Sequence, residues 1–519
     1  MEIFGNIFFM LLLFSSIFSI VSSRKEPSSN NIDWWCNQTP HPKPCKHYTT
    51  QMKSHFKIKH RVDFRRMLVQ QALEQSIFMQ KESQQNSSVK HKIVHGDCLK
   101  LFKNTIFHLN RTLEGLNKMC SPNDAQTWLT TSLTNIETCK NGALELNVQD
   151  FNFIVHNNVI EMIRNTLAIN MHFLKHNKET GEGSFPSWFS KHERKLLQSK
   201  SSLKFNIVVA KDGSGQFKTV QAALDNAAKR KYKARFVIHV KKGVYKENIE
   251  VNVHNDNIML VGDGMQNTII TSSRSVQGGY TTYSSATAGI DGLHFIARDI
   301  TFQNTAGPHK GQAVALRSAS DLSVFYRCAI SGYQDTLMTH AQRQFYRQCY
   351  IYGTVDFIFG NAAVVFQNCN IFARKPLDGQ ANMITAQGRG DPFQNTGISF
   401  HNCQIRATSD LKPVVDKYKT YLGRPWQQYS RVMVMKTFID TLVSPLGWSP
   451  WGDTDFAQDT LYYAEYENYG PGSSTKDRVK WPGYHVITSP NEASKFTVTG
   501  LLAGTSWLST TTVPFTSGL

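Results

Sequence analysis

The sequence lacks the marks of several large classes of protein. After the first 23 of its 519 residues, no apolar run is long enough to span a bilayer, which takes about 20 residues. It has no zinc-finger, KH or RRM signature, no Cys/His cluster with metal-ligand spacing, and no Gly-x-Ser-x-Gly nucleophile elbow. These absences exclude a multi-pass membrane protein and argue against a nucleic-acid-binding module, a metal site and a serine esterase. Apolar residues at 40% and charged residues at 18% also exclude a wholly disordered chain.

The N-terminus predicts secretion. Residues 7–21 are almost entirely apolar, and two serines separate them from Arg24. No Lys or Arg precedes this run, and a signal anchor is the alternative, but the run is short for a membrane span. We therefore expect residues 1–23 to be a cleaved signal peptide, which leaves no membrane segment in the mature protein. Three N-x-S/T triplets fit a secreted glycoprotein: Asn37, Asn86 and Asn110.

The net charge of +18 is spread over both halves of the chain. A diffuse positive field favours an extended polyanion as a partner, either nucleic acid or an acidic polysaccharide. Because no nucleic-acid-binding signature is present, we do not expect nucleic acid.

The first half has the pattern of a helical bundle. Within residues 60–176, apolar side chains recur at three- and four-residue steps in several segments, as on one face of a helix. Ser121-Pro122 looks like the N-cap and first residue of a further helix. Four amphipathic helices with short links predict an all-α up-down bundle. The clearest stripe consists of Leu99, Phe102, Ile106, Leu109, Leu113 and Leu116.

Cysteines support this bundle. Cys36 and Cys45 lie across a Pro-rich turn, and Cys98 and Cys139 lie on two of the expected helices. In an oxidising compartment they are interpreted as structural bridges, with free buried thiols as the alternative. Cys120 is left over.

A composition change divides the chain into four parts: residues 1–23, 24–180, 181–203 and 204–519. Residues 181–203 are expected to be a linker, with the basic stretch Arg194-Lys195-Leu196-Leu197 in the middle. Such a stretch in an exposed linker is a candidate protease site, and a solvated charge cluster is the alternative.

The second half carries an internal repeat. Residues 325–330 read Phe-Tyr-Arg-Cys-Ala-Ile, and related hexapeptides begin at 346, 366 and 400, with weaker copies at 295 and 434. One strand-like signature about every 20 residues predicts an all-β domain, a right-handed parallel β-helix, with a β-sandwich as the alternative.

This repeat stacks four cysteines in one column, because equivalent positions on adjacent rungs lie about 4.8 Å apart. That spacing is within the range of Cα separations that disulfides allow. Either Cys349–Cys369 alone, or Cys328–Cys349 together with Cys369–Cys403, is compatible with the spacing.

The same repeat stacks a polar column. Asp335 and Asp356 are separated by 21 residues, the step from Cys328 to Cys349, so they should lie on neighbouring rungs. Two carboxylates this close titrate as a coupled pair, which supplies one nucleophile or base and one proton donor. Nearby amide side chains can stabilise an oxyanion, and the candidates are Gln312 and Gln334.

Arg424 could keep one carboxylate ionised, and Trp426 could present a flat face to a sugar ring. Each of these residues alone has a structural alternative as a turn, ladder or core residue. Spacing does not separate ester hydrolysis from glycosidic cleavage, because both can use two carboxylates.

Residues 204–519 resemble plant pectin methylesterases, and residues 24–180 resemble the pectinesterase-inhibitor domain. The second resemblance depends on the helical pattern and the cysteine spacings, and the stretch from Arg194 to Leu197 resembles the family's basic processing motif. The first depends on five ordered motifs: Gly243-Val-Tyr-Lys-Glu247, Gly311-Gln-Ala-Val-Ala-Leu316, Gly332-Tyr-Gln-Asp-Thr-Leu337, Gly353-Thr-Val-Asp-Phe-Ile-Phe-Gly360 and Leu422-Gly-Arg-Pro-Trp426.

The resemblance implies residue roles. Asp356 would be the nucleophile on a galacturonate methyl ester, and Asp335 the proton donor and then the base. Gln334, with Gln312, would stabilise the oxyanion. The resemblance also implies substrate contacts by Thr281, Arg424 and Trp426, and further cleft positions for Phe357 and Trp448.

The resemblance also implies a setting. The protein would be a monomeric carboxylic ester hydrolase, secreted to the cell wall, acting on methyl-esterified homogalacturonan without a cofactor. A proteinaceous pectinesterase inhibitor and a subtilisin-like processing protease would be partners, and the N-terminal domain would be autoinhibitory or a pro-region. The alternatives are a β-helix pectin lyase or hydrolase that cuts the polymer, and a non-catalytic wall-binding or inhibitor protein.

Overall fold

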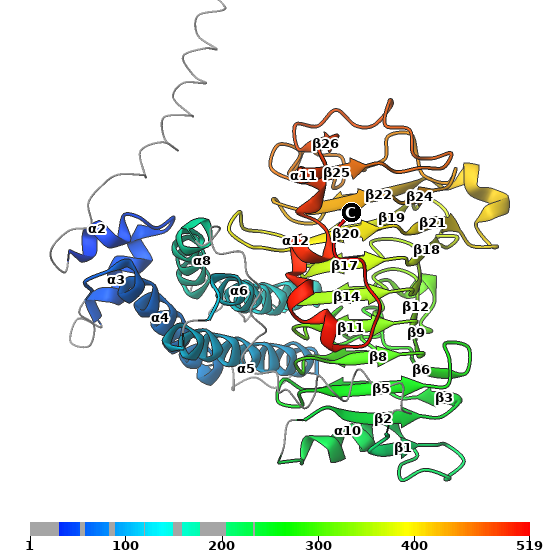
Figure 1. Cartoon of the computed structure of the whole chain (residues 1–519), viewed down its shortest axis with the longest axis horizontal. Helices are drawn as coiled ribbons and strands as arrows, with labels where there is room; N and C mark the ends of the chain where they lie inside the picture. Colours follow the sequence, from blue (N-terminus) through cyan, green and yellow to red (C-terminus); the bar gives the residue numbers. More distant parts are fainter. Residues whose placement is uncertain are drawn as a thin grey trace, which may run out of the picture.

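A bundle of helices lies beside a long coil of parallel strands (Figure 1). The structure is a computed structural model, and it describes residues 31–51, 58–82, 89–118, 120–148, 158–176, 204–231 and 234–519. The predicted signal peptide, Asn86 and the basic stretch from Arg194 to Leu197 lie outside these residues. Among the described helices, none combines the length and apolarity needed to cross a membrane.

The bundle has the four long helices that the apolar periodicity predicts. They are α4 (Arg61–Glu82), α5 (Val89–Asn117), α6 (Pro122–Glu145) and α8 (Val159–His176), and the short α2 (Ile32–Cys36) and α3 (Pro42–Gln51) precede them. Ser121 caps α6 as predicted, because its hydroxyl accepts a hydrogen bond of 3.1 Å from the backbone N–H of Asp124.

Two predicted disulfides of the bundle are confirmed. Cys36 is bonded to Cys45 near α2 and α3, and Cys98 on α5 is bonded to Cys139 on α6. Cys120 is free, as the pairing left it. Two of the predicted glycosylation sites, Asn37 and Asn110, are exposed on this domain.

The second half is the predicted parallel β-helix, in which three sheets wrap around one apolar core and every ladder between strands is parallel. The seven-stranded sheet consists of β4 (Ile249–Val251), β7 (Ala288–Ile290), β10 (Leu316–Ser318), β13 (Leu337–Thr339), β16 (Ile358–Gly360), β19 (Asn382–Gln387) and β22 (Thr420–Pro425). The eight-stranded sheet consists of β3 (Gly243–Lys246), β6 (Thr268–Ser272), β9 (Thr301–Asn304), β12 (Ala329–Ser331), β15 (Tyr350–Gly353), β18 (Asn370–Ala373), β21 (Gln404–Ala407) and β24 (Phe438–Ile439). The eleven-stranded sheet consists of β1 (Ile207–Val209), β2 (Phe236–Val240), β5 (Ile258–Gly262), β8 (Ile296–Arg298), β11 (Ser323–Tyr326), β14 (Arg343–Arg347), β17 (Ala363–Gln367), β20 (Gly397–His401), β23 (Arg431–Met435), β25 (Tyr462–Tyr466) and β26 (Tyr484–Val486).

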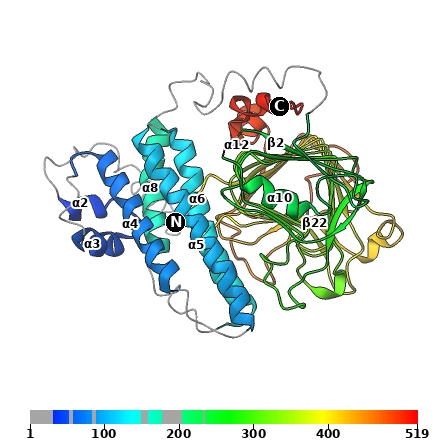
Figure 2. The same cartoon turned by 90° about the horizontal axis from the view of Figure 1, so that it is seen from below.

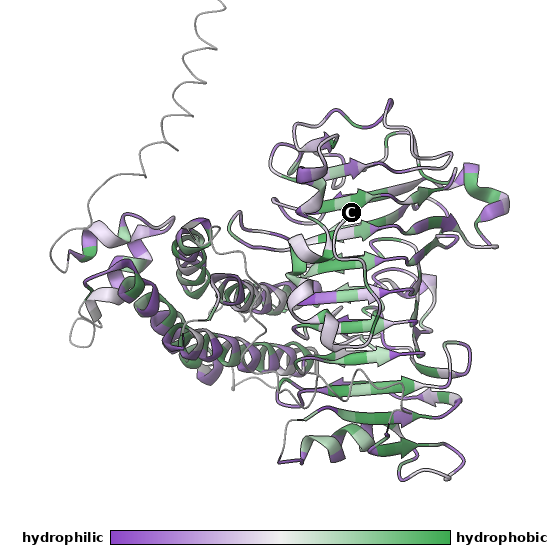
Figure 3. Cartoon of the chain, in the orientation of Figure 1, coloured by the Kyte–Doolittle hydropathy of each residue, from purple (hydrophilic) through white to green (hydrophobic). Residues whose placement is uncertain are grey.

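Short helices complete the coil. Helix α10 (Val220–Ala228) covers the first rung, and Figure 2 shows it lying across that end of the coil. Helices α11 (Pro490–Ser494) and α12 (Val498–Leu502) pack on the eleven-stranded sheet through apolar side chains. Figure 3 shows hydrophobic residues along the strands throughout the coil, which fits a core that runs its whole length.

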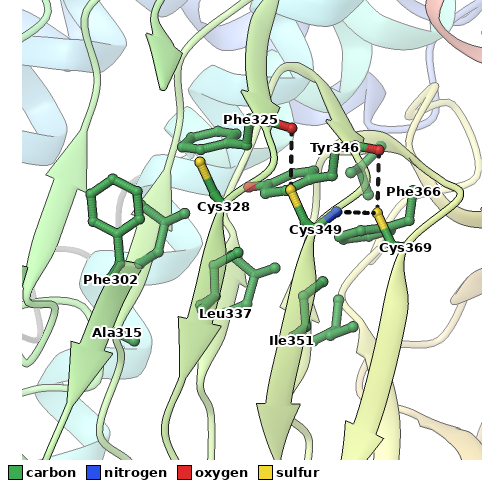
Figure 4. Close-up of a cluster of buried hydrophobic side chains, with 14 of the residues drawn as sticks. Phe302, Ala315, Phe325, Cys328, Leu337, Tyr346, Cys349, Ile351, Phe366 and Cys369 are labelled. Atoms are coloured by element: carbon green, nitrogen blue, oxygen red, sulfur yellow. Dashed lines mark hydrogen bonds between the residues drawn. The ribbon is translucent and has the colours of Figure 1, made fainter. Parts of the chain in front are cut away.

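The hexapeptide repeat predicts the rung register for its strong copies. Phe325, Tyr346, Phe366 and Phe400 pair in sequence across the eleven-stranded sheet. The rings of the first three form a stack inside the coil (Figure 4), and the ring of Phe400 is tilted against that of Phe366. The register predicted from the weak copy at residue 295 is wrong by two residues, because Phe325 pairs with Ala297 and not with Phe295.

The expected disulfide between Cys349 and Cys369 is absent, and so are its alternatives. The thiols of Cys328, Cys349, Cys369 and Cys403 are free and buried. The thiol of Cys349 donates to the Phe325 carbonyl oxygen at 3.2 Å, and that of Cys369 to the Tyr346 carbonyl oxygen at 3.5 Å (Figure 4). In-register neighbours keep their Cβ atoms about 4.8 Å apart, whereas a disulfide needs about 3.5–4.5 Å. The Cα spacing allowed the bridge, but the parallel side chains do not make it.

Candidate active site

One cavity of about 280 Å³ on the seven-stranded sheet brings together the predicted polar residues. Asp335 and Asp356 each lie two residues before a strand of that sheet, β13 and β16, and Leu337 pairs with Ile358. The two aspartates therefore occupy equivalent positions on neighbouring rungs, as their 21-residue spacing predicts. The cavity is also lined by Thr281, Gln312, Gln334, Arg424 and Trp426.

The backbone at both aspartates has a left-handed conformation. The φ angle is 58° at Asp335 and 50° at Asp356, which costs a non-glycine residue on the order of 1–3 kcal/mol. This turn lets adjacent Gln334 and Asp335 both face the cavity, which a regular strand would not allow. Gly353 is needed beside it, since a Cβ there would lie 2.2 Å from the Cβ of Phe357.

Asp356 and Arg424 form a two-pronged ion pair. Nε of Arg424 donates to Oδ1 of Asp356 at 2.8 Å, and Nη2 donates to Oδ2 at 2.6 Å. Burial raises the pKa of Asp356, and the hydrogen bonds and charge of Arg424 oppose that rise. The arginine therefore favours an ionised Asp356.

Asp335 has no such cation in contact. Burial raises its pKa well above the usual value, and the charges of Asp356 and Glu145 raise it further. Of the two coupled carboxyls, Asp335 is therefore the one that holds the proton, and Asp356 is the anion.

Gln312 and Gln334 supply the amides of the site. Both line the cavity, and neither side-chain amide hydrogen-bonds to another of the described residues. Their N–H groups are free to donate to a bound oxygen atom.

The aromatic wall differs from the prediction at two positions. Phe357 and Trp448 are wrong as cleft residues, because both are fully buried in the core of the coil, and Trp448 stacks on Tyr463 at 4.2 Å. Trp451, which sequence reasoning missed, lines the cavity beside Trp426, and the guanidinium of Arg424 lies 4.4 Å from its ring centroid. The sequence signal for Trp451 is its place next to Gly452 in a polar loop, where a large aromatic side chain is unusual.

The bundle supplies a further wall that the sequence did not predict. Thr138, Asn141, Gly142 and Glu145 of α6 line the same cavity as the aspartates. Gly142 suits this close approach, since a Cβ there would lie 3.2 Å from Cγ2 of Thr281 and would make a tight contact.

Two carboxylates of the bundle bind adjacent threonines of the cleft. The hydroxyl of Thr281 donates to Asp97 of α5 at 2.5 Å. Glu145 accepts from the backbone N–H of Thr282 at 2.7 Å and also from its hydroxyl. The predicted substrate contact, Thr281, is therefore occupied by a side chain of the same protein.

Apolar and charged contacts extend this interface on both sides of the cavity. Tyr283, Met338, Phe359 and Ala386 of the coil belong to the same apolar cluster as the interior of the bundle. Ion pairs surround that cluster: Lys100–Asp291 at 2.9 Å, Arg111–Asp321 at 3.4 Å, Arg343–Asp124 at 2.7 Å and Arg164–Asp391 at 3.5 Å.

The cavity lies on a parallel β-helix and contains two neighbouring aspartates, one of which is bound by an arginine, and two amide side chains. This arrangement is that of a β-helix hydrolase. Family models agree: the pectinesterase model matches residues 206–505, and the plant invertase/pectin methylesterase inhibitor model matches residues 30–169. The chain belongs to the pectinesterase family and carries an inhibitor-like N-terminal domain.

Whole-chain relatives have the same two parts. A probable pectinesterase/pectinesterase inhibitor of Arabidopsis thaliana is 57% identical, over 95% of this chain and 94% of its own. Pectinesterase 2 of Citrus sinensis is 52% identical, over 97% and 98%. Pectin methylesterase from carrot is a similar solved structure, with 56% identity and a TM-score of 0.60 over 62% of this chain and 100% of that one.

Proposed function

We propose that the protein is secreted to the cell wall and hydrolyses methyl esters of galacturonate units in homogalacturonan. The products are methanol and acidic pectin. The observation that carries this proposal is the pairing of an anionic Asp356, held by Arg424, with a neutral Asp335 on the next rung.

In the first half-reaction, an Asp356 oxygen attacks the ester carbonyl carbon. The carbonyl oxygen becomes an oxyanion, which accepts hydrogen bonds from the amides of Gln312 and Gln334. The bond to the methoxy group then breaks, and Asp335 gives that oxygen its proton, so methanol leaves and an acyl-enzyme anhydride remains.

In the second half-reaction, Asp335 is ionised and takes a proton from water. The water oxygen attacks the acyl carbon, the bond to Asp356 breaks, and the galacturonic acid carboxyl group is released, which loses the remaining water proton to solvent. Asp356 is again an anion and Asp335 again holds a proton, so the cycle closes.

The N-terminal domain inhibits this reaction in cis. Its Asp97 and Glu145 occupy hydrogen-bond donors of the cleft, and α6 closes one side of the cavity. A processing protease that cuts at residues 194–197 would let the bundle leave, and a separate inhibitor protein would bind the same face. The covering of the cleft by the bundle supports both proposed partners, the protease and the inhibitor protein.

The test uses the full chain with an engineered protease site between residues 181 and 203. Methanol release from highly methylated pectin should rise after the cut, while the viscosity of the pectin solution stays constant. Asp356→Asn should lower methanol release by at least about a thousandfold, and Asp416→Asn, an exposed aspartate on the coil, should leave it unchanged.

Three results would contradict the proposal. Falling viscosity without methanol would indicate a chain-cleaving enzyme. Neither signal from folded, cut protein would indicate a wall-binding protein. Equal rates before and after the cut would refute inhibition in cis.

A further inference from the structure

A second cavity lies near the turns that lead from the seven-stranded sheet to the eleven-stranded sheet, and it shares no lining residue with the cleft. It has a volume of about 250 Å³ and opens where the eleven-stranded sheet meets the C-terminal helices. Arg389 comes from the corner after β19, Arg431 begins β23, and Glu492, Lys495 and Phe496 come from α11 and the residues after it. None of its lining residues belongs to the bundle, which lies beside the coil in Figure 2 while the C-terminal helices lie above it. Among the residues that the structure describes, the bundle therefore covers the catalytic cleft and not this cavity.

Arg389 and Arg431 are half-buried, and they differ from several more deeply buried arginines of the coil. Arg317, Arg343 and Arg478 each contact a carboxylate through the guanidinium. Neither Arg389 nor Arg431 forms an ion pair with any of the described residues. Asp391, the acidic neighbour of Arg389, contacts Arg164 of the bundle instead.

The guanidinium of Arg389 is satisfied by the fold. It donates to the carbonyl oxygens of Gln394, Tyr429 and Pro392, at 2.8, 3.3 and 2.5 Å. These bonds fix the corner loop and hold the positive charge in place.

The guanidinium of Arg431 is satisfied only in part. Its Nε donates to the Thr396 carbonyl oxygen at 2.6 Å, and its two terminal nitrogens have no hydrogen-bond partner among the described residues. Burial and the like charge of Arg389 together lower the pKa of Arg431 to about 9, although Tyr462 opposes the change. The group is still charged at neutral pH, so a half-buried cation with free donors faces the cavity.

The rest of the wall suits an acidic sugar. Tyr462 and Phe496 stack at 5.5 Å and give an apolar aromatic wall beside Arg431. Glu492 is neutralised by Lys495 at 2.6 Å, which leaves the two arginines as the net charge of the cavity. Paired guanidinium donors recognise carboxylates, and aromatic walls accept the C–H faces of sugars.

We propose that this cavity is a second carboxylate-binding site, which holds a de-esterified galacturonate unit of pectin while the bundle still covers the catalytic cleft. The choice of ligand depends on the proposed function, because acidic pectin is the product of that reaction. A site of this kind would anchor the uncut protein to regions of the wall that are already de-esterified.

The test measures the affinity of the uncut, full-length protein for a fully de-esterified decagalacturonate by calorimetry. Arg431→Gln should weaken binding about tenfold, the size of one charge-assisted hydrogen bond lost. Arg406→Gln is the matched control, since it removes the same charge from a more exposed position on β21 and should change little. Glu492→Gln should strengthen binding about twofold by removing a negative charge.

Several outcomes would overturn the proposal. They are the absence of binding, an equal loss in Arg431→Gln and Arg406→Gln, and equal affinity for methyl-esterified decagalacturonate. Equal affinity for poly-glutamate would show a site for acidic proteins instead. Methanol release by cut Arg431→Gln protein should equal that of the cut unmutated protein, which separates this test from the test of the esterase and shows that the variant is folded.

Discussion

Docking of the bundle on the cleft should weaken as the pH rises. Burial against Thr281 raises the pKa of Asp97 from 3.8 to about 6, although hydrogen bonds from Thr281 and Ser284 and the charges of Arg317 and Lys100 oppose the rise. In the undocked bundle, the Asp97 carboxyl returns to water and to its ordinary pKa. Because the docked state binds this proton more tightly, docking is strongest below pH 4, and its free energy falls as the pH rises through 6.

The size of the effect follows from the shift. At 1.36 kcal/mol per pKa unit, the rise from 3.8 to about 6 corresponds to about 3 kcal/mol, or somewhat over a hundredfold in the docking equilibrium. Glu137 acts in the same direction, since burial raises its pKa to about 7. The dissociation constant of the two pieces should therefore be at least about a hundredfold higher at pH 7.5 than at pH 4.5.

Sedimentation of the cut protein at the two pH values measures this directly. Asp97→Asn, which keeps a neutral side chain at all pH values, should remove most of the Asp97 share of the dependence and tighten docking at pH 7.5. Asp33→Asn is the control, because Asp33 is exposed at the far end of the bundle and pairs with Lys46. Equal dissociation constants at both pH values, or a full pH dependence in Asp97→Asn, would refute the reasoning.

Two further predictions concern the catalytic pair and the thiol column. Arg424→Met leaves the buried Asp356 anion without its partner, so the pKa of Asp356 should rise further. The acid limb of the kcat profile should then move to higher pH, and Arg424→Lys should restore it in part. An unmoved limb would contradict the role of the ion pair. In denaturant without reductant, five thiols per chain should react with a thiol reagent, since two disulfides use four of the nine cysteines; three or one would indicate bridges in the column.

The sequence predicts the β-helix because each rung must place the same side chains inward. Phe325, Tyr346 and Phe366 recur at that position, and their spacing gives the register. The error at residue 295 has a physical cause: residues two apart on a strand point to the same side, so Phe295 and Ala297 are both inside the coil. A two-residue slip therefore leaves the inward pattern intact and cannot be detected from it.

The parts of the site that depend on strand register could be predicted. The parts that depend on which way a side chain points could not. Asp335 and Asp356 share a rung position, so the spacing alone places them together. Phe357 is adjacent to Asp356, but the left-handed backbone at Asp356 turns the carboxyl to the cavity while the Phe357 ring packs in the core. No spacing rule shows which of two neighbours faces outward at such a turn.

The covering of the cleft could not be predicted from spacing, because its contacts join residues far apart in sequence. Helix α6 nevertheless carried a signal. Thr127, Thr130, Thr131 and Thr134 are all buried, on turns of a helix that already has an apolar face in the bundle. Threonine is a weak helix former, and a hydroxyl that donates to the carbonyl oxygen one turn earlier, as Thr134 does to Thr130 at 2.9 Å, can still accept a hydrogen bond. Asn361 donates to Thr134 at 2.9 Å, and His340 contacts the hydroxyl of Thr138 at 2.8 Å. A helix that places a row of small hydroxyl side chains outside its apolar stripe is therefore suited to a second contact, and here that contact is the catalytic cleft.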